Sequence, residues 1–176
     1  QMVAIYYYEE DSTPMTAPHD SGKLVRAEEL RSLGVFYDHL TPEKVEDLAV
    51  ERHYKNRDYI TLDSASFPGG ESALNEKLDI FFTEHIHEDE EIRYIIDGEG
   101  YFDVRDVNDR WIRARVEVGD MLILPAGIYH RFTLTDKKYV KALRLFKDEP
   151  KWVALNRSEE TEVNPYRKEY KTEFKV

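Results

Sequence analysis

The feature that most constrains the fold is a series of short strands, closely spaced along the second half of the chain. Before residue 85 the apolar residues recur with a helical period, and after it the period is two. Turns rich in Gly, Pro and Asp separate the strands. Short strands at close, regular spacing are typical of an antiparallel sandwich or barrel. We predict strands over residues 91–97, 101–105, 111–117, 121–124, 130–134 and 140–146, with 98–100 as the turn between the first two.

The residues before this region are expected to form mostly helices. Thr41 followed by Pro42 is typical of a helix start, and Ser72 is expected to cap a later helix that leads directly into His85. Gly34 is suited to end the first helix. The expected elements are a strand over 3–8, a loop over 11–22, and helices over 26–33, 42–54 and 72–83.

A chain of 176 residues is long enough for one domain with a sizeable core. We therefore expect a single domain over 1–176 in three parts. These are a helical N-terminal part over about 24–83, a β-barrel core over about 85–146, and a charged tail over 147–176. The tail is expected to wrap the surface, with Trp152 as its anchor.

Composition limits the partners and the compartment. The formal net charge of -11 argues against nucleic acids and anionic membranes as partners. There are no cysteines, so neither disulfides nor a thiolate metal site can form. We see no secretory signal and no membrane span, which leads us to expect a cytoplasmic protein. A monomer is the default expectation.

Two histidines, His85 and His87, are spaced like metal ligands. Residues i and i+2 of a strand lie on one face, so the two imidazoles point the same way. Imidazole binds divalent iron, nickel, zinc or copper, and a carboxylate such as that of Glu91 would complete a face of three ligands. On a straight strand Glu91 would lie roughly 13 Å from His87, too far for one ion. We therefore predict that the acidic run 88–90 bends and brings Glu91 back at the start of the next strand.

Two segments are similar to the two motifs of the cupin superfamily: His85-x-His87-x3-Glu91-x6-Gly98 and Gly119-x5-Pro125-x-Gly127-x2-His130. The resemblance implies a mainly β cupin, a jelly-roll β-sandwich barrel with a few peripheral, mostly N-terminal helices. It also implies one divalent ion with about two open coordination positions, held by four ligands. These ligands would be His85, His87, Glu91 and His130. Cupins host many reactions, so the motifs do not identify one.

The cupin resemblance has one departure, and three histidines lie outside it. Leu134 stands where the second motif usually has an asparagine, which is not a metal ligand. His19 lies in a predicted loop and is expected to be solvated. His39 and His53 flank the second predicted helix and are expected to be surface or capping residues.

Arg93 is the next residue of interest, because residues 91, 93 and 95 share one face of a strand. Its guanidinium should therefore point into the cavity beside the metal, where it needs an anionic partner. The partner is either an enolate or carboxylate substrate, or a carboxylate of the protein such as that of Glu84, Asp89 or Glu90; the strand face alone does not decide between them. Aromatic or aliphatic residues at the neighbouring inward positions are either plain core or a substrate wall. They are Phe81, Ile95 and Phe132.

Longer stretches of the chain resemble acireductone dioxygenases of the eukaryotic type, over about residues 74–157. The N-terminal part matches more weakly. The stretches are Glu90-Glu-Ile-Arg-Tyr-Ile, Gly100-Tyr-Phe-Asp-Val-Arg-Asp, Asp109-Arg-Trp-Ile-Arg, Leu124-Pro-Ala-Gly-Ile-Tyr-His-Arg-Phe-Thr, Lys141-Ala-Leu-Arg-Leu-Phe and, more loosely, Glu149-Pro-Lys-Trp-Val-Ala-Leu-Asn-Arg.

This resemblance implies a methionine-salvage enzyme that acts with O2 on 1,2-dihydroxy-3-keto-5-methylthiopentene. With Fe2+ it implies formate and 4-methylthio-2-oxobutanoate as products, and with Ni2+ it implies CO, formate and 3-methylthiopropanoate. A recombinant sample could also hold Co2+ or Zn2+. Arg93 would stabilise the anionic substrate, and Phe81, Ile95 and Phe132 would hold its methylthio tail.

Two other functions stay open from the sequence. One is a different cupin reaction on an enediol, such as an isomerisation. The other is a non-catalytic, metal-stabilised cupin that binds proteins. Eukaryotic members of the family have partner-binding roles, so protein partners belong to the expectation, and the family also suggests the nucleus as a second location.

Overall fold

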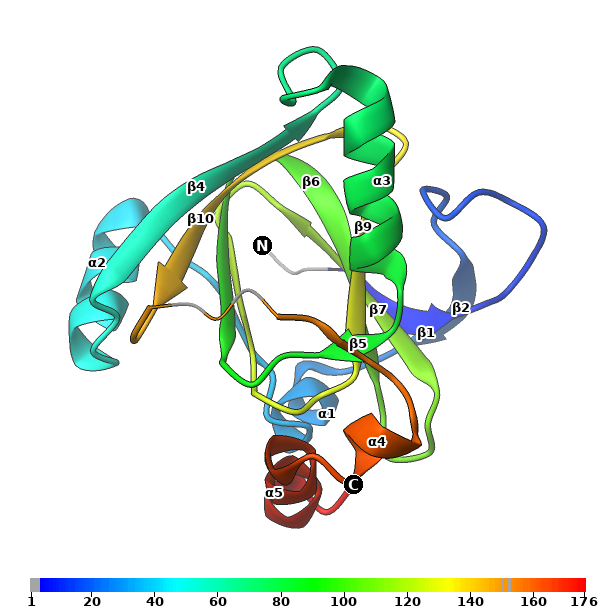
Figure 1. Cartoon of the computed structure of the whole chain (residues 1–176), viewed down its shortest axis with the longest axis vertical. Coiled ribbons are helices and arrows are strands. Elements are labelled where there is room, and N and C mark those ends of the chain that lie inside the picture. Colours follow the sequence, from blue (N-terminus) through cyan, green and yellow to red (C-terminus); the bar gives the residue numbers. More distant parts are fainter. Residues whose placement is uncertain (1–3, 150, 152) are drawn as a thin grey trace.

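The computed structural model describes residues 4–149, 151 and 153–176 (Figure 1). It is mainly β, as expected. The helices are α1 (Ala27–Ser32), α2 (Pro42–Glu51), α3 (Gly70–Phe82), α4 (Glu159–Glu162) and α5 (Pro165–Phe174). The strands are β1 (Ala4–Tyr8), β2 (Asp20–Leu24), β3 (Phe36–His39), β4 (Asn56–Asp63), β5 (His85–Ile86), β6 (Glu91–Arg105), β7 (Trp111–Glu117), β8 (Asp120–Leu124), β9 (His130–Leu134), β10 (Tyr139–Phe146) and β11 (Leu155–Asn156).

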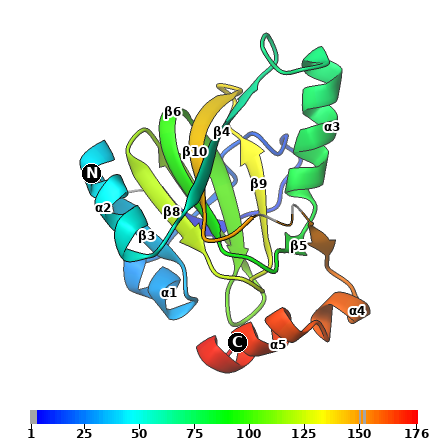
Figure 2. The same cartoon turned by 60° about the vertical axis from the view of Figure 1, so that its left-hand side comes forward.

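Two antiparallel sheets share the long strand β6. The first half of β6 pairs with β8 and β10, and β10 continues to β4 while β8 continues to β3. The second half of β6 pairs with β7 and β9, within a sheet of order β11-β5-β9-β6-β7-β1-β2. Figures 1 and 2 show the two sheets curving around a common interior, with α3 beside β9.

The predicted turn at 98–100 is wrong, because β6 runs without a break from Glu91 to Arg105. Gly98 has a φ of +74°, and a Cβ there would lie 2.2 Å from the carbonyl oxygen of Tyr139. Pairing with β10 also shifts register between Lys141 and Ala142. The glycine therefore marks the bend at which the strand passes from one sheet to the other.

The expected helices before His85 are present, but the part over 24–83 is not simply helical. Strand β4 pairs with β10 along its whole length, and β3 pairs with β8. Most residues of β4 are polar and only one is fully buried, so the sequence does not show the alternation of apolar and polar residues by which a strand is predicted. Helix α3 has Gly69 as its N-cap rather than Ser72, and β2 begins at Asp20, inside the predicted loop.

The apolar residues form two clusters on opposite faces of the β6 sheet. One fills the interior and includes Ile95 and Phe102. The other lies between the sheet and α2, and includes Ile92 and Tyr94. Residues 92 and 94 of β6 thus face α2, and residues 91, 93 and 95 face the interior, as the alternation predicts.

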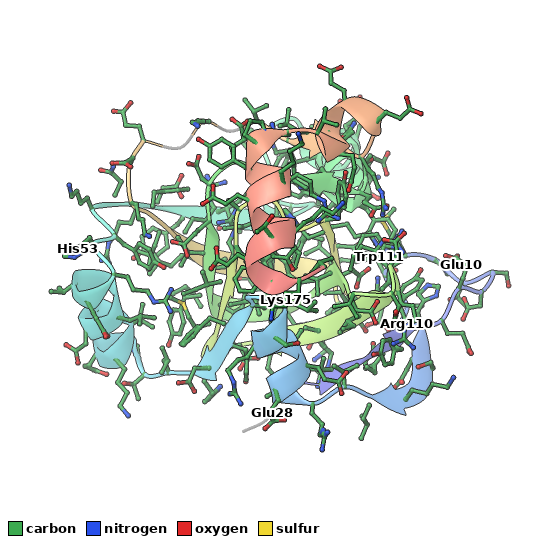
Figure 3. The ribbon with its side chains drawn as sticks, turned by 90° about the horizontal axis from the view of Figure 1, so that it is seen from below. Glu10, Glu28, His53, Arg110, Trp111 and Lys175 are labelled. Carbon is green, nitrogen blue, oxygen red and sulfur yellow. The ribbon has the colours of Figure 1, made fainter. Side chains whose placement is uncertain are left out.

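The tail does more than wrap the surface. Strand β11 pairs with β5, and α5 lies beside α1 across one end of the molecule (Figure 3). Tyr170 of α5 donates a hydrogen bond to the Leu33 carbonyl at 2.7 Å. The predicted anchor Trp152 lies outside the described residues. Among the helices of the described residues, none is long and apolar enough to cross a membrane.

His19 is buried rather than solvated, which corrects the expectation for this loop residue. It is 4% exposed and stacks on the ring of Tyr8, with ring centroids 4.6 Å apart. Its Nδ1 lies 2.9 Å from the Glu9 carbonyl oxygen and its Nε2 lies 2.8 Å from that of Pro14. The imidazole therefore ties residues 9–19 into one ordered loop.

Replacing His19 by glycine is expected to lower the free energy of unfolding by about 1–3 kcal/mol, because a hydrogen bond from the ring to a backbone carbonyl and a ring contact are lost. Glycine suits the φ of +50° at this position, so backbone strain does not enter. Urea unfolding measures the loss. Lys138→Gly is the matched control, since Lys138 is exposed with a φ of +54°. Equal stabilities of the two variants would contradict the role of the imidazole.

Candidate metal centre

Three histidines converge at one end of the interior, two of them in neighbouring strands and the third just after one of these strands. His85 of β5 lies directly opposite His130 of β9 in the sheet register. His87 follows two residues after His85. One ring nitrogen from each of the three histidines lies within 4.8 Å of those of the other two. This is the spacing that a shared metal ion requires.

The orientation of each imidazole leaves its Nε2 available as a ligand. The Nδ1 atoms of His85, His87 and His130 lie 2.5, 2.9 and 2.9 Å from backbone carbonyl oxygens. A carbonyl oxygen can only accept, so each Nδ1 carries a proton, and in the neutral form of each ring Nε2 has the lone pair that a metal ion needs. Within the described residues, the buried Nε2 of His130 has no hydrogen-bond partner. The histidine cluster therefore fits a divalent metal ion.

Glu91 reaches the histidines because the chain bends between β5 and β6, as predicted. Its Oε1 lies 3.3 Å from Nε2 of His87 and 3.6 Å from Nε2 of His130. The amide N–H of Gly127 donates to the His87 carbonyl at 3.0 Å and holds the bend in place. The structure thus brings the four predicted ligand residues together.

The surroundings shift the pKa values of these groups in different directions. Burial lowers the pKa of His85 to about 3, and His130 acts in the same direction. Burial also acts to lower the pKa of His87, but the hydrogen bond and charge of Glu91 outweigh it and raise that pKa above its ordinary value. Burial acts to raise the pKa of Glu91, but Arg93 and the histidines outweigh it and hold that pKa well below its ordinary range. In the metal-free protein, a proton therefore competes with a metal ion more strongly at His87 than at His85.

Arg93 lies inside the cavity, as its strand position predicts. Its Nη2 lies 3.4 Å from Oε1 of Glu91, and its Nη1 donates to the Ile92 carbonyl at 3.0 Å. None of the three carboxylates named as alternative partners pairs with it. Glu84 instead pairs with Arg105 and Arg157. Among the described residues, the other guanidinium N–H groups have no hydrogen-bond partner, so they are available to an anion.

The histidines and Arg93 line one cavity of about 360 Å³. Phe81, Ile95 and Phe132 line it too, and Phe81 meets Phe132 edge to face with ring centroids 6.2 Å apart. The cavity has a polar end at the histidines and an apolar wall. It can therefore hold a small molecule with a charged head and an apolar tail.

The sequence analysis missed several lining residues. Arg144 of β10 lies opposite Arg93 in the register and pairs with Asp58 at 2.6 Å. The same alternation that identified Arg93 could have found it, since residues 140, 142 and 144 all face the cavity. Nothing in the sequence marks Ala154 as a lining residue of the cavity. The remaining lining residues that were missed are Ile60, Leu62, Lys77, Ile80, Phe102, Val140 and Ala142.

The other three histidines lie away from this centre. His19 belongs to the N-terminal loop. His39 is exposed, as expected, and its Nδ1 lies 2.9 Å from Oδ1 of the buried Asp120. His53 is exposed just after α2 with a φ of +61°, in keeping with a surface or capping position (Figure 3).

Comparisons with known proteins agree with this geometry. A family model described as the ARD/ARD' family matches residues 4–154. A protein of Yarrowia lipolytica named acireductone dioxygenase is 56% identical over 167 residues, which are 94% of this chain and 95% of the relative. A protein of the same name from Saccharomyces cerevisiae is 51% identical over 173 residues, 96% of each chain.

A solved structure gives the fold an independent match. It is described as acireductone dioxygenase from Bacillus anthracis with a cadmium ion in its active centre. The TM-score is 0.68 at 25% sequence identity, over 88% of this chain and 98% of the other. The cupin fold expected from the paired motifs is thereby confirmed.

Proposed function

Because the chain belongs to the ARD/ARD' family, we infer that it is a metal-dependent acireductone dioxygenase. Family membership and activity agree with the expectation from the sequence. One structural observation supports the proposed chemistry. Three histidines with available Nε2 atoms, a carboxylate and a buried arginine meet at the polar end of one small-molecule cavity.

His85, His87, Glu91 and His130 would hold the metal ion. When bound, a divalent ion acts as a Lewis acid and template for an enediolate that chelates through two oxygens. The pKa of Glu91, well below its ordinary range, keeps this residue a carboxylate. The Nδ1 hydrogen bonds of the histidines fix ring orientation before the ion arrives.

Arg93 would bind the substrate anion. A guanidinium always carries its charge in proteins, and its planar fork can donate two parallel hydrogen bonds to an enediolate. The ion pair with Glu91 aims the fork at the polar end of the cavity. Arg93 therefore places the charged part of the substrate next to the metal ligands.

Phe81, Ile95 and Phe132 would hold the methylthio tail. These side chains line the wall of the cavity and leave its polar groups clustered at one end. An apolar tail against them excludes water from the reacting atoms. The apolar wall also fixes the orientation of the substrate in the cavity.

The metal would determine the products. We propose formate and 4-methylthio-2-oxobutanoate with Fe2+, and CO, formate and 3-methylthiopropanoate with Ni2+. Co2+ or Zn2+ could occupy the same ligands in a recombinant sample. A cytoplasmic and nuclear location, a monomeric state, protein partners and the lack of nucleic-acid binding stay predictions.

Loading metal-free protein separately with Fe2+ and Ni2+ tests this proposal. With the acireductone and O2, we expect CO from the nickel sample and 4-methylthio-2-oxobutanoate from the iron sample. Gas chromatography and mass spectrometry identify the products, and elemental analysis gives the metal content. Anaerobic turnover would indicate an isomerase instead. Binding of metal with no turnover of any enediol would indicate a non-catalytic module.

A further inference from the structure

One segment of the tail returns to the metal centre from far along the chain. We call residues 153–157, from Val153 to Arg157, the strap. Its strand β11 pairs with β5, so that Leu155 lies opposite Ile86 and Asn156 opposite His85. Figures 1 and 2 both show β11 beside β5. Ala154 of the strap lines the cavity itself.

The strap makes the hydrogen bond that orients His87. His85 and His130 each use a carbonyl two residues earlier in their own segment, those of Thr83 and Ile128. His87 instead donates from Nδ1 to the carbonyl oxygen of Val153 at 2.9 Å, 66 positions away in the sequence. The orientation of this imidazole therefore depends on where the strap lies.

The side chain of Arg157 fastens the strap. Its Nη1 donates to Glu84 at 2.8 Å and to Asp109 at 2.8 Å, and its Nη2 donates to Asp109 at 3.2 Å. The guanidinium also lies 4.5 Å from the centre of the Tyr129 ring. Glu84 directly precedes His85, and Arg105 donates two hydrogen bonds to the same carboxylate.

Apart from the Thr161 hydroxyl, which donates to the Asn156 carbonyl at 2.5 Å, few other contacts of the described residues hold the strap. Strand β11 has only two residues, and the side chain of Val153 is exposed. A two-residue ladder is too short to fix a segment without further contacts. The backbone N–H of Arg157 adds one bond to the Glu84 carbonyl at 3.0 Å, at the same end of the strap.

We propose that Arg157 is a positioning residue of the metal centre, which holds the Val153 carbonyl against Nδ1 of His87. This rests on the metal centre of the proposed function. Groups that orient a ligand imidazole typically contribute about 10–100-fold to metal affinity. Loss of Arg157 should therefore weaken metal binding although Arg157 does not touch the metal.

The test uses the full chain loaded with Co2+. In Arg157→Met, transfer of Co2+ to a chelator, followed by visible absorption, should be roughly 10–100-fold faster than in the wild type. In proton NMR of the Co2+ form, one of the three shifted imidazole N–H signals should exchange faster with solvent. Arg157→Lys should restore part of both properties, because the charge is kept but not the fork.

Two further variants make the result specific. Asp109→Asn weakens the same anchor, and asparagine tolerates the φ of +61° at this exposed position, so it replaces Arg157→Met if that variant does not fold. Arg110→Met is the matched control. Arg110 lies on the same turn, next to Trp111 (Figure 3), but binds Asp106 and Tyr7. Its Co2+ release should match that of the wild type.

The outcomes separate this inference from the proposed function. Wild-type protein that fails to bind Co2+ would overturn both. Wild type that binds Co2+, with unchanged release and N–H exchange in Arg157→Met and Asp109→Asn, would overturn only the role of Arg157. A lower stability in urea with unchanged metal release counts as the same negative result.

Discussion

Replacing His85 by alanine should strip the protein of metal and abolish O2 consumption with an acireductone. His85 is 4% exposed and its Nδ1 is already fixed by the Thr83 carbonyl, so its Nε2 is pre-oriented as a ligand. Removing a group that merely orients a ligand costs about 10–100-fold in affinity, and removing the ligand should cost at least about 100-fold. Elemental analysis after dialysis and an oxygen electrode measure the two effects.

His53→Asn is the matched control for this variant. His53 is exposed at the end of α2, and asparagine tolerates its φ of +61°. The control should keep both metal and activity. Far-UV circular dichroism and urea unfolding then show whether His85→Ala is folded. Undiminished turnover by metal-free His85→Ala protein would refute metal dependence.

Three of the four proposed ligand residues follow from strand geometry, which fixes side-chain direction, whereas His130 came from the resemblance to the second cupin motif. His85 and His87 are two apart at the start of the strand-rich region, and Glu91 begins the next strand. Residue type then gives the chemistry, and alternation along β6 puts Arg93 inside. These inferences need only local rules, and the structure brings the residues together.

The contacts that the sequence did not reveal depend on the path of the chain in space. Any residue carries a carbonyl, so nothing in the sequence marks that of Val153 as the partner of His87. His19 sits among polar loop residues, yet its burial depends on the stack with Tyr8. Gly98 is equally compatible with a tight turn and with a bend in one strand, and only the pairing with β10 decides between them.

Replacing Arg93 by alanine should lower kcat/KM for the acireductone by roughly 10²–10³-fold while the metal is retained. In the proposed function its guanidinium meets the developing negative charge of the substrate, and loss of one such donor typically has an effect of this size. The kcat/KM of Arg93→Lys should fall between those of Arg93→Ala and the wild type, because lysine keeps the charge but not the fork. Steady-state kinetics with a substrate series measures the effect.

Two controls are needed, because Arg93 also lies 3.4 Å from Glu91. Metal content must be determined for each variant, so that a loss of substrate binding is distinguished from a loss of metal. Arg115→Ala removes an arginine that pairs with Glu99 and Glu117 outside the cavity, and its kinetics should match the wild type. If metal-replete Arg93→Ala turned over like the wild type, the ion pair with Glu91 would be its whole role. The substrate anion would then have to be bound by another group.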